Sequence, residues 1–424
     1  MKKLNIDFSC IKDETGYLFS FTKMLAIALK NSVYSDLAED VIATSGFAFR
    51  MWVASDLCPS STSIWEFDGQ KPWVENSGLK CEYVGRYWNQ DNIEEERRLL
   101  AIKNIKASID NNIAAICWDI GVPEWGLIIG YNDDRKIFNT IAVNGIESEI
   151  GYDQLGKREI SILSVLTIVS LNNKSKISVL DSTIKLAVNH LKSKEWCSNS
   201  KGLEAYSTLV KTFEMEDTSL CSSWQMEYLL GTYGSLKYYA YKYFEKSKQL
   251  KLAKMYKNVY NFWIECFNLK KSIDLSIKEN KDKILSLLNK AYEEEAKALN
   301  IMEEYLKKRN LNNSIKITTK EGKLIEFEID AIDVGFSPNF NLAMYTNNYG
   351  LTIANRDWSF MYSHTIIAIN EKDNLYKVIS VNIDKIPKNN TVIPNNGIVF
   401  IVVNNHPRYN ELMSCLKVGE LFTI

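Results

Sequence analysis

The residue types best suited to chemistry are concentrated in one stretch of the sequence, from Cys117 to Tyr131. The stretch contains a thiol, two carboxylates and two indoles around a Gly-Val-Pro turn, and it continues into an apolar run closed by polar residues. An apolar run of this length between turn residues is more often a buried strand than a helix. The sequence therefore predicts that Glu124 begins a buried strand, beside a bend and between aromatic side chains.

A carboxylate in such a place can act as a general acid or base, because apolar surroundings raise its pKa. Glu124 is therefore the first catalytic candidate, although backbone amides or an arginine could equally hold it and fix the bend. Arg50 is the natural partner, since its planar guanidinium would bind a ligand carboxylate or neutralise Glu124 or Asp119. Asp119 itself follows the first strand, where an aspartate commonly caps a turn.

Two further side chains are candidate nucleophiles. Cys117 is close to Asp119 and Glu124 in the sequence, but the apolar residues before it favour a buried and inert thiol. Ser20, in the first predicted helix, could replace a thiol, although a serine without a histidine partner is a poor nucleophile. Tryptophans near these residues are candidates for core packing first and for ligand contact second. The side chains expected around a ligand are Arg50, Trp65, Trp118, Asp119, Trp125 and Tyr131.

Composition restricts the class of protein. The 424 residues are 46% hydrophobic and 24% charged, as in ordinary globular proteins, and their number suggests two or three domains. A net charge of -1 argues against nucleic acid or an anionic membrane as the main partner, since binding phosphates needs a basic surplus. No window reaches the length of a membrane span, and eight scattered cysteines without a Cys-x-x-Cys pair indicate a reduced, cytoplasmic protein. The three histidines, His190, His364 and His406, are far apart, so we expect surface or capping roles for them, no metal site and no cofactor.

The periodicity of apolar residues predicts three domains: mixed α/β over residues 1–172, helical over 173–312 and all-β over 313–424. In the first, we expect helices at 17–30, 35–43 (capped by Ser35) and 94–110, and strands at 113–117, 125–131, 137–143 and 160–171. In the second, we expect a helix capped by Asp181 or Ser182, another opening near 202, and helices at 224–248, 252–269 and 283–309. The tyrosines of 224–248 should pack the bundle, and their phenols could line a cleft between domains. In the third, we expect a hairpin of strands 315–318 and 324–329, then strands at 342–346, 365–370, 375–381 and 398–403.

Several short motifs recur in one protein family. They are Ser45-Gly46-x-Ala48-Phe49-Arg50, Leu57-Cys58-Pro59-Ser60, Pro123-Glu124-Trp125 before an apolar strand, Gly130-Tyr131-Asn132-Asp133, and Gly202-Leu203-Glu204-Ala205-Tyr206. With these motifs, roughly the first three quarters of the chain resemble papain-like proteins grouped with the N-terminal domain of the butirosin-biosynthesis acyltransferase. The resemblance implies an α+β protein, in which a papain-like (cysteine-peptidase-like) α/β domain carries an appended helical bundle and a small all-β C-terminal domain.

The chemistry of that superfamily needs a cysteine at the start of the first helix and a histidine that opens a central strand. A third residue on the next strand orients the histidine. This chain differs at both essential places, because its first helix begins Tyr17-Leu18-Phe19-Ser20 and its strand opens with Glu124-Trp125. We therefore do not expect a thiol peptidase.

The last quarter resembles the small β part of phosphodiester-glycosidase-like proteins. The matching residues are Tyr345-Thr346, Tyr349-Gly350, Asn355, Trp358, Ile393-Pro394-Asn395-Asn396-Gly397 and Lys417-Val418-Gly419-Glu420. The resemblance covers no catalytic residue of that family, so it implies a structural or binding module. A protein partner or a second copy of the chain could bind through this module.

Three functional hypotheses follow from these features. The first is a pseudoenzyme in a biosynthetic pathway, which keeps the ancestral active-site cleft to bind a small molecule or a peptide segment. The second is an acyl or aminoacyl transferase, with Cys117 or Ser20 as the nucleophile and Glu124 as the base. The third is a structural or assembly protein.

Overall fold

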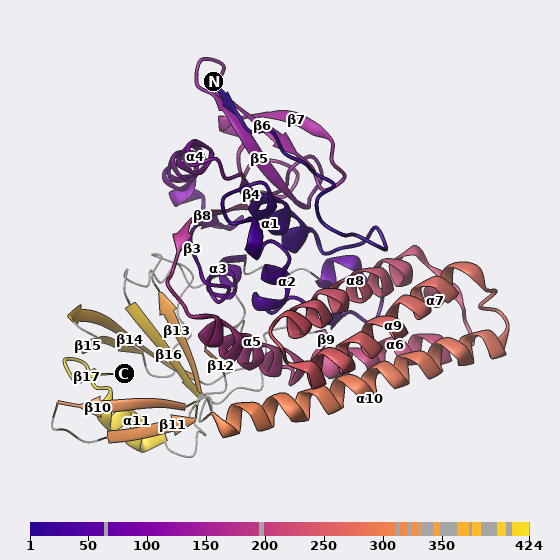
Figure 1. The fold of residues 1–424 in the computed structure, drawn as a ribbon. Helices are drawn as coiled ribbons and strands as arrows, with labels where there is room; N and C mark the ends of the chain where they lie inside the picture. Colours follow the sequence, from indigo (N-terminus) through magenta and orange to yellow (C-terminus); the bar gives the residue numbers. More distant parts are fainter. Residues whose placement is uncertain are drawn as a thin grey trace. The chain divides into compact units, whose positions relative to one another are not determined.

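A computed structural model describes most of the chain, and the described residues fall into two compact units that comprise essentially residues 1–305 and 306–424. Both units mix helices and strands, which confirms the α+β class (Figure 1). The predicted boundary at residue 172 lies inside the first unit, so the division at 172 and 312 stays a prediction. The described residues are 1–62, 67–194, 199–309, 314–320, 322, 324–328, 331–332, 342–347, 363–372, 375–382, 397–403 and 409–423.

The first unit is built around a seven-stranded antiparallel sheet, in the order β3-β8-β4-β5-β6-β7 with β1 added beside β5. The predicted strands near 113, 125, 137 and 160 are confirmed within a few residues, whereas β3 and β7 have no counterpart among the predictions. The strands are β1 Lys2–Lys3, β3 Leu79–Arg86, β4 Ala115–Trp118, β5 Trp125–Asn132, β6 Ile137–Ile141, β7 Glu147–Gly151 and β8 Leu163–Leu171.

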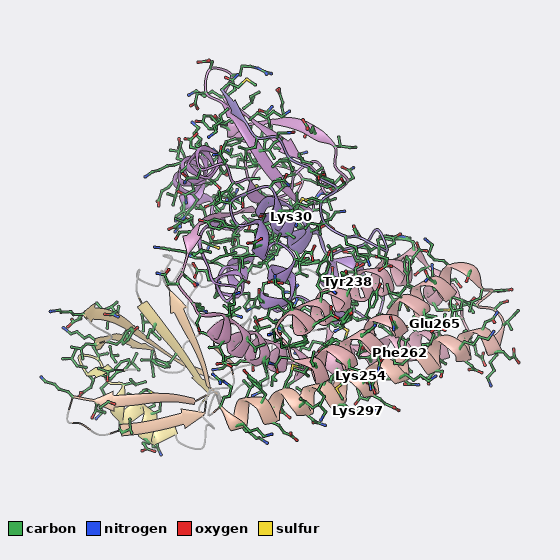
Figure 2. The ribbon with its side chains drawn as sticks, in the orientation of Figure 1. Lys30, Tyr238, Lys254, Phe262, Glu265 and Lys297 are labelled. Atoms are coloured by element: carbon green, nitrogen blue, oxygen red, sulfur yellow. The ribbon has the colours of Figure 1, made fainter. Side chains whose placement is uncertain are left out.

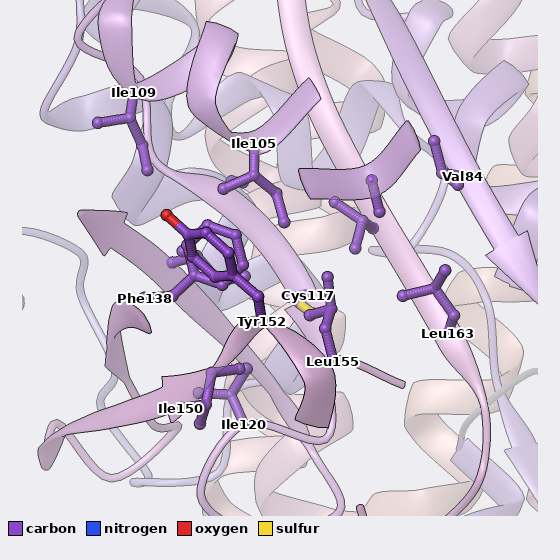
Figure 3. Close-up of a cluster of buried hydrophobic side chains, with 14 residues drawn as sticks. Val84, Ile105, Ile109, Cys117, Ile120, Phe138, Ile150, Tyr152, Leu155 and Leu163 are labelled. Atoms are coloured by element: carbon purple, nitrogen blue, oxygen red, sulfur yellow. The ribbon is translucent and has the colours of Figure 1, made fainter. Parts of the chain in front are cut away.

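Helices α1 (Ser20–Lys30) and α4 (Glu94–Asp110) cover opposite faces of this sheet. On the α1 face, the ring of Phe21 meets the indole of Trp125, with 4.9 Å between ring centroids. On the α4 face, Ile105 packs in a buried cluster that includes Cys117 (Figure 3). Because side chains alternate between the two faces along a strand, the strand residues of one cluster cannot contribute to the other.

Of the remaining helices of the first unit, α2 and α3 precede strand β3 in the sequence, α5 to α10 follow strand β8, and the long helices α8, α9 and α10 form a bundle. Helix α5 begins after Ser175, whose side chain accepts a hydrogen bond from the Ser178 amide, so the predicted caps Asp181 and Ser182 are wrong. Ser35 likewise caps nothing, because it is the first residue of the short turn η1 (Ser35–Leu37), which has no side-chain cap. The helices are α2 Asp40–Thr44, α3 Gln70–Glu75, α5 Lys176–Leu191, α6 Ala205–Glu214, α7 Ser219–Ser222, α8 Trp224–Lys246, α9 Leu250–Ser272 and α10 Lys278–Lys308, and a short β2–β9 pair joins Trp52–Val53 to Ser200–Lys201.

Helices α9 and α10 show why these segments fold as a bundle. Tyr256 and Trp263 lie two helical turns apart on the same face of α9, and both are fully buried. The opposite faces carry exposed charged side chains such as Lys254, Glu265 and Lys297 (Figure 2). The buried face of each helix therefore needs neighbours, which the other helices supply.

Charged groups are also buried inside the bundle. The ammonium group of Lys237 on α8 lies 2.5 Å from a carboxylate oxygen of Glu295 on α10, and both side chains are 0% exposed. Tyr206 donates a hydrogen bond to the other oxygen of Glu295, and the indole of Trp263 donates to the Tyr206 hydroxyl. This network satisfies the buried ion pair and links four helices.

Helix α8 also binds the bundle to the α/β part of the unit. The Tyr233 hydroxyl donates to the carbonyl oxygen of Trp52 at 2.5 Å and accepts from the Trp52 amide at 2.8 Å. Tyr239 donates to the Lys12 carbonyl oxygen at 2.5 Å. The predicted packing role of these tyrosines is confirmed.

In its described residues, the second unit contains an eight-stranded sheet, in the order β11-β10-β17-β15-β14-β16-β13-β12, and one helix. The predicted β10–β11 hairpin is confirmed, with Gly322 at φ 81° in its turn. The all-β description was wrong in one respect, because helix α11 contributes Leu412 to the core beside Ile366 and Phe400. The elements are β10 Ser314–Thr319, β11 Leu324–Glu328, β12 Ala331–Ile332, β13 Leu342–Asn347, β14 Ser363–Lys372, β15 Leu375–Asn382, β16 Gly397–Val403, α11 Tyr409–Cys415 and β17 Leu421–Thr423.

Candidate functional site

Two of the candidate catalytic residues, Ser20 and Glu124, lie in direct contact. Ser20 is the first residue of α1, Glu124 immediately precedes β5, and the Ser20 hydroxyl donates to the Glu124 carboxylate with 2.5 Å between the oxygens. They meet because α1 packs on the face of the sheet that carries Trp125. The contact joins positions 104 residues apart in the sequence.

The surroundings of this pair raise the pKa of the Glu124 carboxyl group. Burial raises the pKa of Glu124, and the hydrogen bonds from Ser20 and from the Trp125 amide oppose that shift. A carboxyl group with a raised pKa can exchange a proton or pair with a cation closer to neutral pH than an exposed glutamate can.

Helix α8 places the phenol of Tyr228 near Glu124. The pKa of Tyr228 is raised to about 12, first by burial and then by the charge of Glu124. The Tyr228 hydroxyl lies 3.3 Å from the Thr62 hydroxyl, and its ring meets Tyr17 edge-on at 5.7 Å. The tyrosine-rich pattern of the helix indicated that phenols could line a cleft, but nothing in the sequence distinguished Tyr228 or Thr62 from their neighbours.

Aromatic side chains surround the pair and include a donor without an acceptor. Trp118 and Trp125 are 5% and 0% exposed, and both contact the ring of Phe67, so they belong to the core. The buried indole N–H of Trp125 has no hydrogen-bond acceptor in the described part of the chain. Buried donors are seldom left unsatisfied, so this one is a candidate contact for a bound molecule or water. Trp65, the third predicted indole, lies outside the described residues.

Arg50 does not neutralise Glu124 or Asp119, and its predicted contact with a ligand stays a prediction. Its guanidinium is 5% exposed, lies 4.2 Å from the ring centroid of Phe47 and 4.6 Å from that of Trp52, and donates to the Thr62 carbonyl oxygen. No ion pair joins Arg50 to Glu124 or Asp119, all three of which are described residues. Cation–π contacts therefore hold the arginine beside a cavity of about 10 Å³, which is large enough for a single water.

Cys117 is placed on the wrong face of the sheet to act with Glu124. It is 1% exposed and packs in the α4-side cluster, whereas Ser20 and Glu124 lie on the α1 side. Its thiol donates to the Trp118 carbonyl oxygen, and burial raises its pKa far above the ordinary value. These properties match the inert thiol rather than the nucleophile.

Asp119 and Tyr131 also lie away from the pair. The Asp119 carboxylate accepts a hydrogen bond from the Ile160 amide at 3.2 Å, so it holds a loop distant in sequence instead of capping its own turn. Tyr131 is near the far end of β5, about 20 Å along the strand from Glu124, and donates to Asp110. Neither residue contacts Ser20 or Glu124.

The prediction that His190 is a surface or capping residue was wrong. His190 is 1% exposed, its ring meets Trp73 edge-on at 5.3 Å, and Gly46, at φ 83°, leaves room for it. Burial and the charges of Arg50 and Lys237 hold its pKa well below the ordinary value. The side chain of His364, on β14, and the whole of His406 lie outside the described residues.

The described residues contain neither a metal-binding group of side chains nor a membrane-spanning helix. No group of three or more His, Cys, Asp or Glu side chains among the described residues is arranged to hold a metal ion. Within the same residues, every helix is too short or too polar to cross a lipid bilayer.

Comparisons with known proteins add no assignment to this site. No protein-family model matches the sequence, and no curated protein matches it.

Proposed function

We propose that this chain is a papain-like-fold protein without peptidase activity, which binds a small molecule or a peptide segment where helix α1 meets the start of β5. The observation that carries the proposal is the hydrogen bond between Ser20 and Glu124. In the resembling family, the first helix supplies the nucleophile and the strand opening supplies its base. Here a hydroxyl and a carboxyl group meet at those two elements instead.

The chemistry of the pair supports binding more than peptide hydrolysis. The Ser20 side chain is 5% exposed, so a peptide carbonyl has little access to its hydroxyl, and its partner is a carboxyl group rather than the imidazole of the usual peptidase pair. A buried carboxylate is instead suited to recognise an ammonium or hydroxyl group of a ligand. The Tyr228 phenol and the unsatisfied indole N–H of Trp125 add polar groups near it.

Thermal unfolding with and without candidate ligands tests this proposal. The probes are amino acids, dipeptides and aminoglycosides, each of which carries an ammonium group. A ligand at about 100 times its Kd stabilises the native state by about 2.7 kcal/mol, which is measurable as a rise in Tm. We expect at least one of these classes to raise the Tm of the wild-type protein and Glu124→Gln to abolish the rise.

Glu75→Gln is the matched control for this experiment. Glu75 is also a half-buried carboxyl group whose pKa is raised by burial, but it lies on α3, where it accepts from the Cys81 amide. The ligand-induced rise should persist in this variant. A rise that survives Glu124→Gln unchanged would contradict a site at Glu124, and no rise with any class would favour a structural role.

The second candidate function is an acyl or aminoacyl transferase, and one observation favours it. The Ser20 hydroxyl donates directly to Glu124, as a nucleophile donates to its base, and it lies at a helix N-terminus. If Ser20 is a nucleophile, a fluorophosphonate should modify it in the wild-type protein and not in Glu124→Gln. Absence of modification at Ser20, measured by peptide mass spectrometry, would leave binding as the function.

A further inference from the structure

A second site lies elsewhere in the first unit. A pocket of about 550 Å³ opens between the β4–β5 turn, the β6–β7 hairpin and the segment that follows β7. Its lining includes neither Ser20 nor Glu124. The volume falls in the range of about 300–1,000 Å³ that is usual for small-molecule sites.

The walls of the pocket combine apolar and polar groups. Val122 and Ile146 line it and are 41% and 62% exposed, so they offer apolar surface to a bound molecule. Asn144 and Gln154 add amide groups. The turn that carries Val122 needs Gly121, at φ 81°, because a Cβ there would lie 2.7 Å from the Cβ of Ala142.

Arg158 is the cation of the pocket. Its side chain lines the cavity and forms no ion pair or hydrogen bond with any other described residue. Glu149 of the lining is bound by Arg135 at 2.7 Å. Burial raises the pKa of Asp119 and the charge of Arg158 opposes that shift, although no ion pair joins these two described residues. The guanidinium of Arg158 is therefore available to an anion.

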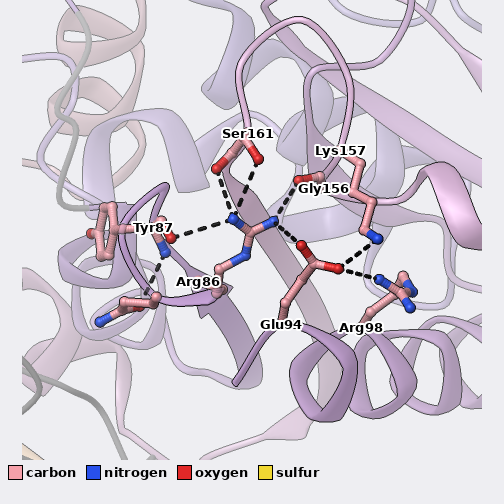
Figure 4. Close-up of polar contacts among 8 residues, drawn as sticks. Arg86, Tyr87, Glu94, Arg98, Gly156, Lys157 and Ser161 are labelled. Carbon is pink, nitrogen blue, oxygen red and sulfur yellow. Dashed lines mark hydrogen bonds and ion pairs between the residues drawn. The ribbon is translucent and has the colours of Figure 1, made fainter. Parts of the chain in front are cut away.

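The loop that carries Arg158 is held at both ends by a buried arginine. Arg86, which is 1% exposed, donates to the carbonyl oxygens of Gly156 at 2.7 Å and Ser161 at 3.0 Å (Figure 4). Glu94 lies 3.7 Å from the same guanidinium. Arg158 lies between these two anchor points, so its backbone is ordered before any ligand arrives.

Asp119 holds the same loop from the sheet. Its carboxylate accepts from the Ile160 amide, two residues after Arg158, and Asp119 is itself 3% exposed. A guanidinium on a preorganised loop binds a planar anion with less loss of conformational freedom than one on a mobile loop. The buried side chains of Asp119 and Arg86 therefore both hold the loop that carries Arg158.

We propose that this pocket binds a small molecule in which a carboxylate adjoins an apolar group, with Arg158 as the anchor of the carboxylate and Val122 and Ile146 against the apolar part. The planar fork of arginine matches a carboxylate in two parallel hydrogen bonds. The same chemistry can come from a free organic acid or from the C-terminus of a short peptide.

Calorimetric titration of the full-length protein distinguishes these sources. The probes are octanoate and phenylacetate for free acids, N-acetyl-Leu-Leu for a peptide C-terminus, and the corresponding neutral amides. We expect at least one acid to bind and its amide to bind about tenfold more weakly or not at all, because the amide loses the charge-assisted contact. Binding of the free acids alone or of the peptide alone identifies the source.

Substitutions of pocket residues test whether the acid binds in this pocket. Arg158→Gln should weaken binding about tenfold or more, and Arg158→Lys should restore part of it. Lys157→Gln is the matched control, because it removes the same charge from the same loop while its ammonium group pairs with Glu94 rather than lining the pocket. Val122→Asp, at an exposed position, should also abolish binding by placing a negative charge beside the anchor.

Two results would overturn this proposal. One is the absence of heat from every acid up to about 10 mM with the folded wild-type protein. The other is equal binding by the wild type, Arg158→Gln and Val122→Asp. Neither result bears on the Ser20–Glu124 proposal, because neither of those two residues lines this pocket.

Discussion

The replacement of Glu124 by glutamine should change how the stability of the protein depends on pH. Burial raises the pKa of Glu124 in the native state above its ordinary value of 4.5, which the unfolded chain retains. Between these two values, the unfolded chain has released the proton and the native protein still holds it. The free energy of unfolding of the wild type should therefore fall as pH rises through this window, by about 1.4 kcal/mol per pH unit.

Glutamine cannot ionise, so the variant lacks this loss. The free energy of unfolding of Glu124→Gln minus that of the wild type should rise with pH by the same amount per unit, and should become constant above the native pKa. The Ser20 hydrogen bond lowers the pKa of Glu124, so Ser20→Ala should extend the window to higher pH. Removal of that bond to a charged group should also cost about 1.5–3 kcal/mol above the window.

Urea unfolding measured between about pH 5 and about pH 8 tests this reasoning. Tryptophan fluorescence is the appropriate signal, because Trp118 and Trp125 lie beside the carboxyl group. Glu94→Gln is the control whose difference from the wild type should not change with pH in this range, since Lys157 and Arg98 lower the pKa of Glu94 and its contribution is already complete above 4.5. A difference for Glu124→Gln that stays constant or falls as pH rises would refute burial as the dominant influence on this group.

Three further predictions concern other parts of the first unit. Lys237→Met should destabilise the bundle by about 3–5 kcal/mol, because it leaves Glu295 charged and buried, and the added change Glu295→Met should recover most of that loss in urea unfolding. Iodoacetamide at near-neutral pH should modify the exposed Cys58 in the native protein and Cys117 only after unfolding, as peptide mass spectrometry can show. Arg86→Met should increase amide hydrogen exchange in the loop that Arg86 holds, with little change in the sheet.

Periodicity predicted the long elements of the fold well. Strand β5 was placed within one residue because its apolar run lies between turn residues, and helix α4 begins and ends as expected although its apolar pattern is weak and Leu99 and Leu100 are exposed. Strand β3 was missed, although its burial alternates, because glycine and charged residues interrupt its apolar pattern. Helix α11 was missed because it is only seven residues long.

The candidate site was predicted in part. Glu124 and Ser20 were both identified, but their contact depends on the packing of α1 against the sheet, which no local pattern records. Cys117 is seven residues from Glu124 in sequence, yet the alternation of side chains along β4 directs it to the opposite face. Arg158 was not identified, since its importance depends on a loop that Arg86 and Asp119 hold from distant parts of the chain.

The two hydrogen bonds between Tyr233 and Trp52 have a practical consequence for anyone who shortens this chain. A fragment that stops near residue 172 would lose the phenol and uncover Phe49, whose ring now rests against Phe244 and Tyr256. Such a fragment would expose a hydrophobic patch to solvent and should aggregate on expression. A fragment that runs to residue 309 keeps this patch covered.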